Sequence, residues 1–128
     1  MQIISNNTSW KSVVRVSSVA NLTLTAPQTV DDVVLIEGDT ILVKNQTTAS
    51  ENGSYIVKDL DWVRSDTMLT GSDAAGAAVF IKEGTTNSDT IWICIDDKSI
   101  VGTDPLTFAS IPTFKKELFL NPYGYCSY

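Results

Sequence analysis

A segment of this chain occurs twice, and the duplication constrains the fold more than any other feature of the sequence. The run Ile41-Leu-Val-Lys-Asn-Gln-Thr-Thr-Ala-Ser-Glu51 returns 38 residues later as Val79-Phe-Ile-Lys-Glu-Gly-Thr-Thr-Asn-Ser-Asp89. Each copy joins two apolar runs through a polar turn. This pattern predicts a β-hairpin, because β-branched and aromatic residues suit a pleated surface while Asn, Ser, Thr and Gly gather where a chain reverses. We therefore expect two equivalent sheet-forming units.

The rest of the chain has the same strand-like character, with apolar residues that alternate or form short runs rather than recurring at helical spacing. We expect strands at residues 13–16, 22–24, 33–36, 41–45, 54–58, 60–64, 79–83, 90–95 and 106–111. The runs 33–36 and 90–95 are apolar on both sides, so the first is expected to be central and the second to be covered on both faces. Residues 65–78 lack strand character and predict one short helical turn.

These strands suggest how the domain is built. A three-stranded unit leaves one apolar face uncovered, and pairing two such units buries that face. The sequence therefore predicts an all-β fold, a single-domain antiparallel β-sandwich or barrel with extended termini. We divide the 128 residues into an N-terminal arm at 1–12, a β-domain at 13–112 with the repeat at about 41–64 and 79–108, and an aromatic C-terminal tail at 113–128.

Composition and charge exclude several classes of function. The formal net charge of −6, with nine scattered basic residues, argues against a nucleic-acid-binding groove, which needs clustered Lys and Arg. No apolar run approaches the roughly 20 residues that span a bilayer, so no membrane partner is expected. The chain has no His, and its two Cys lack metal-ligand spacing. We therefore expect no metal, no cofactor and no enzymatic activity.

Several motifs occur in a fixed order between residues 13 and 111. They are Val14-Arg-Val-Ser-Ser-Val-Ala-Asn-Leu-Thr-Leu24, Gln28-Thr-Val-Asp31, Glu37-Gly-Asp-Thr-Ile-Leu-Val-Lys-Asn-Gln46, Ala49-Ser-Glu-Asn-Gly-Ser-Tyr55, Trp62-Val-Arg64, and Gly84-Thr-Thr-Asn-Ser-Asp89 with Trp92. Together they resemble a repeat domain of tailed-bacteriophage tail fibres and related virion proteins. The resemblance implies a non-enzymatic structural protein of the virion, acting as a fibre component, adaptor or capsid decoration. It also implies partners among other virion proteins and a homo-oligomer, by analogy a trimer.

The C-terminal tail supports assembly on physical grounds, because it packs five aromatic residues into positions 114–128. Apolar and aromatic surface of this density favours association when it is exposed. We therefore predict a partner-binding set that consists of Phe114, Leu118, Phe119, Tyr123, Tyr125 and Tyr128. The alternative is that Phe119 and Leu120 fold back onto the open end of the same domain.

A second function from another class stays open, namely a carbohydrate-binding module that recognises host surface glycans. Trp10, Trp62 and Trp92 could stack on sugars, helped by polar loops at residues 47–52 and 85–89. The opposing interpretation places Trp92 in the core, because it alternates with isoleucines, and Trp62 at the matching position of the first unit. Acidic pairs such as Asp31-Asp32 lack the spacing of a calcium loop and are interpreted as solvated turn carboxylates.

Overall fold

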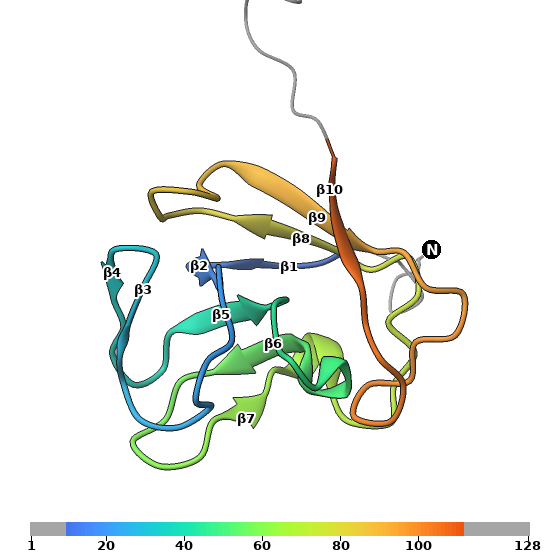
Figure 1. Cartoon of the computed structure of the whole chain (residues 1–128), viewed down its shortest axis with the longest axis horizontal. Coiled ribbons are helices and arrows are strands. Elements are labelled where there is room, and N and C mark those ends of the chain that lie inside the picture. Colours follow the sequence, from blue (N-terminus) through green and yellow to red (C-terminus); the bar gives the residue numbers. More distant parts are fainter. Residues whose placement is uncertain (1–9, 112–128) are drawn as a thin grey trace, which may run out of the picture.

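The computed structural model describes residues 10–111, which form a nearly all-β single domain of the sandwich type (Figure 1). One four-stranded sheet, here sheet A, has the order β1 (Trp10–Val14), β8 (Ala78–Ile81), β9 (Thr90–Cys94) and β10 (Phe108–Ile111). The other, sheet B, has the order β2 (Val16–Ser17), β5 (Thr40–Val43), β6 (Gly53–Ile56) and β7 (Val63–Arg64). The all-β prediction is confirmed.

Three smaller elements complete the domain. Strands β3 (Thr29–Val30) and β4 (Val33–Val34) form a separate two-stranded hairpin. The 3-10 turns are η1 (Ala49–Glu51) in the loop between β5 and β6, and η2 (Asp66–Met68) directly after β7. The turn η2 is the short helical turn that the sequence predicts within residues 65–78. Within residues 10–111, no helix has the length and apolar character needed to cross a membrane.

The two sheets repeat one another, as the duplicated sequence predicts. In sheet B, Ile41 lies opposite Tyr55, and Tyr55 lies opposite Arg64. In sheet A, the corresponding pairs are Val79 with Trp92 and Trp92 with Ser110. Each unit is therefore a hairpin with a third antiparallel strand, and the third strands are β7 and β10.

Each unit also has a fourth strand that pairs in parallel, a feature that the sequence did not predict. Strand β1 runs parallel to β8, and β2 runs parallel to β5. The two strands are consecutive, so the chain crosses from sheet A to sheet B at Arg15. A parallel pair requires a long crossover, which for β2 and β5 is supplied by the segment that contains the β3–β4 hairpin. The sheets are consequently mixed rather than purely antiparallel.

The apolar side chains form two cores, whereas pairing of the units predicts one shared core. Core 1 lies against sheet A and receives Leu42 from β5 and Met68 from η2. Core 2 lies on the other face of sheet B and is covered by the β3–β4 hairpin. Core 1 contains Val14, Leu42, Met68, Ala74, Ala77, Val79, Ile81, Cys94, Val101, Leu106 and Phe108. Core 2 contains Val16, Val30, Val33, Leu35, Ile41, Val43, Tyr55, Val57 and Trp62, with Leu22 and Leu24 packed against it.

Three predicted strands differ from the structure. Residues 13–16 are divided at Arg15 between β1 and β2, which belong to different sheets. Residues 33–36 are not a central strand, because β4 ends at Val34 and the side chains of Val34 and Ile36 are 67% and 63% exposed. Residues 22–24 form no strand, although Leu22 and Leu24 do pack against core 2 as the alternation predicts. At the start of the described residues, β1 begins at Trp10, inside the segment that the sequence assigns to the N-terminal arm.

Candidate functional site

The six residues predicted to bind partners, Phe114, Leu118, Phe119, Tyr123, Tyr125 and Tyr128, lie outside the described residues, so their role stays a prediction. The structure describes the strand that leads to them. Strand β10 is an outer strand of sheet A and ends at Ile111, three residues before Phe114. Within residues 10–111, β10 lies at the edge of its sheet, has four residues and contains no charged side chain. By contrast, β7 has two residues and contains Arg64, and β1 has a register shift between Trp10 and Ser12. Natural sheet edges are commonly protected by such features, and β10 lacks them.

The motif residues of the first repeat form a network that we call the loop brace, which consists of Gln46, Glu51, Asn52, Tyr55 and Arg64. The backbone N–H of Gln46 donates to Oδ1 of Asn52 at 3.0 Å, and Nδ2 of Asn52 donates to the carbonyl of Leu106 at 2.9 Å. Asn52 is buried and has a φ of −64°. Its role is therefore to connect the two units, and the positive φ at this turn, 140°, belongs to Gly53.

Arg64 closes the loop brace from the third strand. Its Nη1 and Nη2 donate to the carbonyl oxygens of Asn52 at 2.6 Å and Ser50 at 3.0 Å, and its guanidinium lies 4.5 Å from the centre of the Tyr55 ring. Burial lowers the pKa of Arg64 and raises the pKa of Tyr55. A Cβ at Gly53 would collide with Nη1 of Arg64, so only glycine allows this approach.

Gln46 and Tyr55 attach the loop to its surroundings. The Gln46 side chain accepts a hydrogen bond from the backbone N–H of Leu22 at 2.7 Å and donates to the Leu22 carbonyl at 2.9 Å and to Oε1 of Glu51 at 3.0 Å. The Tyr55 hydroxyl donates to the carbonyl of Glu51 at 2.5 Å. The most distinctive motif residues of the first repeat are thus engaged in holding one loop in place.

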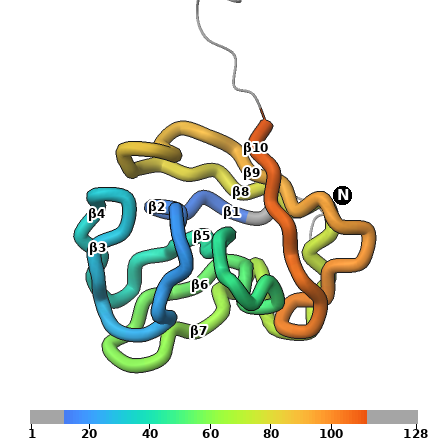
Figure 2. The backbone as a smooth tube through the Cα atoms, in the orientation of Figure 1, coloured from blue at the N-terminus to red at the C-terminus, as the bar shows by residue number. Residues whose placement is uncertain are grey.

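The second repeat is held by the β3–β4 hairpin, whose tip reaches the loop between β8 and β9 (Figure 2). Both turn residues, Asp31 and Asp32, have positive φ angles of 48° and 67°. The Asp31 carboxylate accepts hydrogen bonds from the backbone N–H of Thr86, at 3.0 and 2.9 Å to its two oxygens, and of Asn87 at 3.2 Å. Partial burial acts to raise the pKa of Asp31, but these donors outweigh it, and the pKa lies below its ordinary value.

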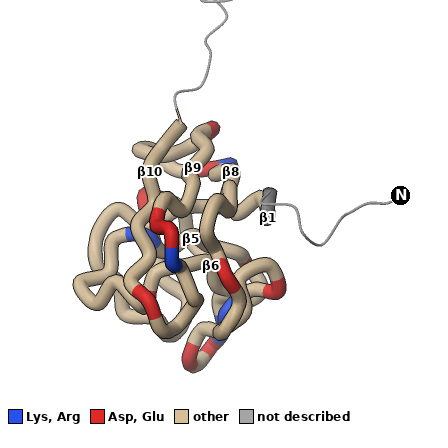
Figure 3. Tube along the Cα trace, turned by 90° about the vertical axis from the view of Figure 1, so that its right-hand side faces the viewer, with Lys and Arg blue, Asp and Glu red and all other residues tan. Residues whose placement is uncertain are grey.

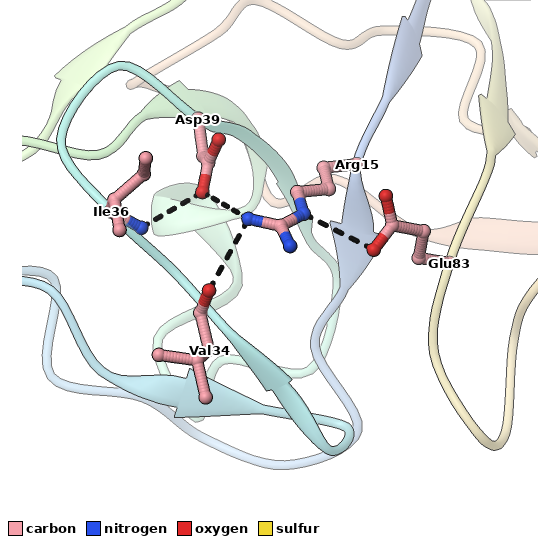
Figure 4. A network of polar contacts seen from close by, with 5 residues as sticks. All are labelled: Arg15, Val34, Ile36, Asp39 and Glu83. Atoms are coloured by element: carbon pink, nitrogen blue, oxygen red, sulfur yellow. Dashed lines mark hydrogen bonds and ion pairs between the residues drawn. The ribbon is translucent and has the colours of Figure 1, made fainter.

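Arg15 occupies the crossover between the two sheets and joins both repeats (Figure 4). Its Nη1 donates to Oδ2 of Asp39 at 2.7 Å and to the Val34 carbonyl at 3.2 Å, and its Nε donates to Oε1 of Glu83 at 3.2 Å. The hydrogen bond to Asp39, followed by that to Glu83, raises the pKa of Arg15. Around this junction lies an open, largely polar hollow of about 360 Å³, which is lined also by Thr40 and Lys82.

The tryptophans proposed for sugar stacking are engaged inside the domain where the structure describes them. Trp62 is 6% exposed in core 2, and its Nε1 donates to the Ala26 carbonyl at 3.0 Å. Trp92 packs against core 1, and Nζ of Lys44 lies 4.2 Å from its ring centre. Burial lowers the pKa of Lys44. The side chain of Trp10 lies outside what the structure describes.

Acidic residues are distributed over the turns rather than gathered in one place (Figure 3). Among residues 10–111, no group of three or more Asp, Glu, His or Cys side chains is placed to hold a metal ion. Several of the carboxylates serve the local backbone instead. For example, Oδ2 of Asp104 accepts from the backbone N–H of Ile100 at 3.0 Å, and Oδ2 of Asp96 accepts from that of Thr107 at 2.5 Å.

The side of sheet A that points away from core 1, here called the outer face, is apolar on all four strands. Because side chains alternate along a strand, the core residues Val79, Ile81, Cys94 and Phe108 place their neighbours on the opposite side. In register across the sheet, the outer face carries Val13, Phe80, Ile91 and Ile111 in one row and Ala78, Ile93 and Ala109 in the next. None of these seven residues belongs to either core. On the outer face, Ala78 is buried, Phe80, Ile91, Ile93 and Ala109 are half-buried, and Val13 and Ile111 are exposed. The described residues therefore cover this face only in part, whereas the sequence predicts a β9 that is covered on both faces.

Comparison with known proteins adds no relative: no protein-family model, curated protein or solved structure matches this chain.

Sequence reasoning missed two of the polar centres described above. Arg15 was included in an apolar strand, although a lone charge within Val13-Val-Arg-Val16 is a signal that the strand is interrupted there. Asp31 was interpreted as a solvated turn carboxylate, and its partners Thr86 and Asn87 are more than fifty residues away in the sequence. A local pattern contains no information about a contact of that separation.

Proposed function

We propose that this chain is a structural component of a virus particle, used as a fibre component, adaptor or capsid decoration, and that it works by assembling with copies of itself and with other virion proteins. The observation that supports this proposal is the loop brace. The motif residues that carry the resemblance to tail-fibre repeat domains, such as Gln46, Asn52 and Arg64, stabilise the fold by joining strands and loops. A domain whose distinctive residues brace its own loops is suited to a mechanical role.

The proposal assigns assembly to the tail beyond β10. A strand that is uncharged and outermost in its sheet leads into a segment with five aromatic residues, two of the chain's nine basic residues, and one of its fifteen acidic residues. The body is therefore acidic and the tail slightly basic. This difference favours contact between the tail of one subunit and the body of another. Burial of the aromatic side chains would supply most of the association energy.

The test compares the full chain with a chain truncated after Glu117, using sedimentation velocity for assembly and circular dichroism for folding. We expect the truncated chain to keep the β-sheet spectrum and to lose association. A full-length variant with Phe119, Tyr123, Tyr125 and Tyr128 replaced by Ser separates side-chain chemistry from chain length, and should behave like the truncation. Normal assembly of either variant would refute the role of the tail.

The glycan-binding hypothesis lacks an observation in its favour among the described residues, because Trp62 and Trp92 are engaged internally. It predicts that host polysaccharide shifts or quenches the tryptophan emission of the full chain. An unchanged spectrum on titration would count against it.

A further inference from the structure

The outer face of sheet A has a counterpart in the first unit, and the two differ in burial. Leu42 lies opposite Ser54 in sheet B, and Phe80 lies opposite Ile91 in sheet A, so the two pairs occupy equivalent positions. Leu42 and Ser54 are fully buried, whereas Phe80 and Ile91 are only partly buried. At these positions, the side chains of the second unit are thus more apolar than those of the first unit and are also less buried.

The residues that directly follow the third strand of the first unit contribute to the cover of these positions. After β7, the chain turns through η2 and places Met68 in core 1, together with Leu42, where Met68 is fully buried. The turn η2 packs against β6, the strand that carries Ser54. Next to it, the hydroxyl groups of Ser54 and Ser65 form a hydrogen bond. Leu42 also packs with the sheet A residues of core 1, so residues 65–68 add to the cover of this face and do not supply all of it.

The strand register identifies the segment that corresponds to η2 in the second unit. Arg64 lies opposite Tyr55, and Ser110 lies opposite Trp92, so Ser110 is the counterpart of Arg64. Counting four residues onward from each gives Met68 in the first unit and Phe114 in the second. The residue before each of them is a threonine, Thr67 or Thr113.

We propose that the segment directly after β10 folds back over the outer face of sheet A of its own chain, with Phe114 seated near Phe80 and Ile91 as Met68 is seated near Leu42. Phe114 then belongs to the domain, and the residues from Leu118 onward remain for partners. This inference concerns the root of the tail and does not depend on assembly of the remainder.

The size of the face argues for this occupant over a second copy of the sheet. Four strands about 4.8 Å apart, each about 15 Å long, make a face of roughly 300 Å². A stable contact between two proteins buries about 800 Å² on each partner. Two outer faces packed against each other would fall well short of that. An aromatic side chain such as Phe114 can bury about 150–250 Å², which is half or more of the area of this face.

The direct test uses the full chain with the methyl groups of isoleucine and the rings of phenylalanine labelled for NMR. We expect nuclear Overhauser contacts between the Phe114 ring and the methyl groups of Ile91 or Ile93, and none to Ile36, which is exposed elsewhere on the domain. A sample mixed from two separately labelled preparations shows whether the contact is within one chain. Contacts found only between chains, or no contact from Phe114 to the outer face, would overturn the proposal.

A mutational test measures the same contact through stability. Ile91→Ser introduces the residue that the first unit has at this position, Ser54, and Phe114→Ser removes the occupant. Each should lower the melting temperature by about 5 °C or more, and the double variant should lose little beyond the larger single loss. Ile36→Ser, the matched control at another exposed isoleucine, should change it by less than about 2 °C. Additive losses, or an unchanged melting temperature for Phe114→Ser, would contradict the proposal.

These outcomes are separable from those of the proposed function. A chain truncated after Glu117 keeps Phe114, so Phe114→Ser should lower the melting temperature of the truncated chain as well, even though that chain has lost the stabilisation that association provides. If that truncated chain assembles normally while Phe114 contacts the outer face, the proposed role of the tail fails and the present inference stands.

Discussion

Substitution of Gly84 by alanine should be among the most destabilising small changes on the surface of this domain. Gly84 lies in the loop after β8, with a φ of +119°, and an added Cβ would collide with Oδ2 of Asp31 and lie 3.1 Å from its Cγ. Two costs follow from this geometry. The backbone is strained for any residue with a side chain, and the Asp31 carboxylate must move away from the N–H groups of Thr86 and Asn87.

The two costs can be estimated separately. Backbone strain in a conformation that L residues rarely adopt costs about 1–3 kcal/mol. Hydrogen bonds to a charged acceptor contribute about 1.5–3 kcal/mol. Because these N–H donors belong to an exposed loop, solvent reduces their contribution to about 1–2 kcal/mol. Gly84→Ala should therefore lower the free energy of unfolding by about 2–5 kcal/mol.

Gly38 provides the matched control, because it has a φ of +98° and its added Cβ would meet nothing within 4 Å. Gly38→Ala should show the strain alone, so the two variants should differ by about 1–2 kcal/mol in urea unfolding followed by tryptophan fluorescence. In an Asp31→Ser background, Gly84→Ala should cost no more than Gly38→Ala. Equal losses for Gly84→Ala and Gly38→Ala in the natural background would refute the reasoning.

Three further predictions test other parts of the structure. Leu42→Ala removes a fully buried side chain that links sheet B to core 1; urea unfolding should show a loss of about 2–5 kcal/mol, against less than about 0.5 kcal/mol for exposed Val34→Ala, and similar losses would place Leu42 outside the core. In Arg64→Lys, the single ammonium group cannot bind both carbonyl oxygens of the loop brace, so the free energy of unfolding should fall by about 1–3 kcal/mol. An unchanged urea midpoint would show that the two guanidinium hydrogen bonds are dispensable. The pKa of Asp31 is lowered on folding, so its stabilisation is present above the unfolded value of about 4 and is lost as pH falls through the folded pKa; Asp31→Asn should lose less stability than the natural chain between pH 7 and pH 3, and parallel profiles would contradict this.

The duplicated hairpin was the part of the fold that the sequence predicted best, because two copies of one sequence are expected to form the same strand pairs. Once Ile41 and Val79 are recognised as equivalent, the hairpin in one copy implies the hairpin in the other, and the register confirms both. The third strands were also predicted, although β7 begins at Val63 and β10 at Phe108, after the Leu60 and Leu106 positions expected to open them.

Position within the sheets was harder to predict. The run 33–36 is apolar on both sides, and this pattern is shared by a central strand and by a short hairpin that buries only Val33 and Leu35. Only the tertiary fold decides between them, because β4 docks on core 2 with one face and leaves Val34 in solvent. The parallel pairs of β1 and β2 were equally hidden, since partners in a parallel pair are distant in sequence and leave no local signal.

The candidate site, too, could be predicted from the sequence only in part. The motif residues were identified from sequence, but their role as the loop brace depends on contacts such as that of Asn52 with Leu106, 54 residues apart. The apolar character of β9 was read correctly from the alternation of Ile91, Trp92 and Ile93. The half-buried state of Ile91 and Ile93 among the described residues was not predicted, because the cover over a strand depends on the whole arrangement.

The central claim is that this chain is a structural protein that assembles with copies of itself. The mass of the full chain in solution tests this claim most directly. For the chain with its aromatic tail intact, sedimentation equilibrium over a range of concentrations should give a species of at least twice the 13.9 kDa of one chain. A mass of 13.9 kDa that does not change with concentration up to the millimolar range would contradict the claim.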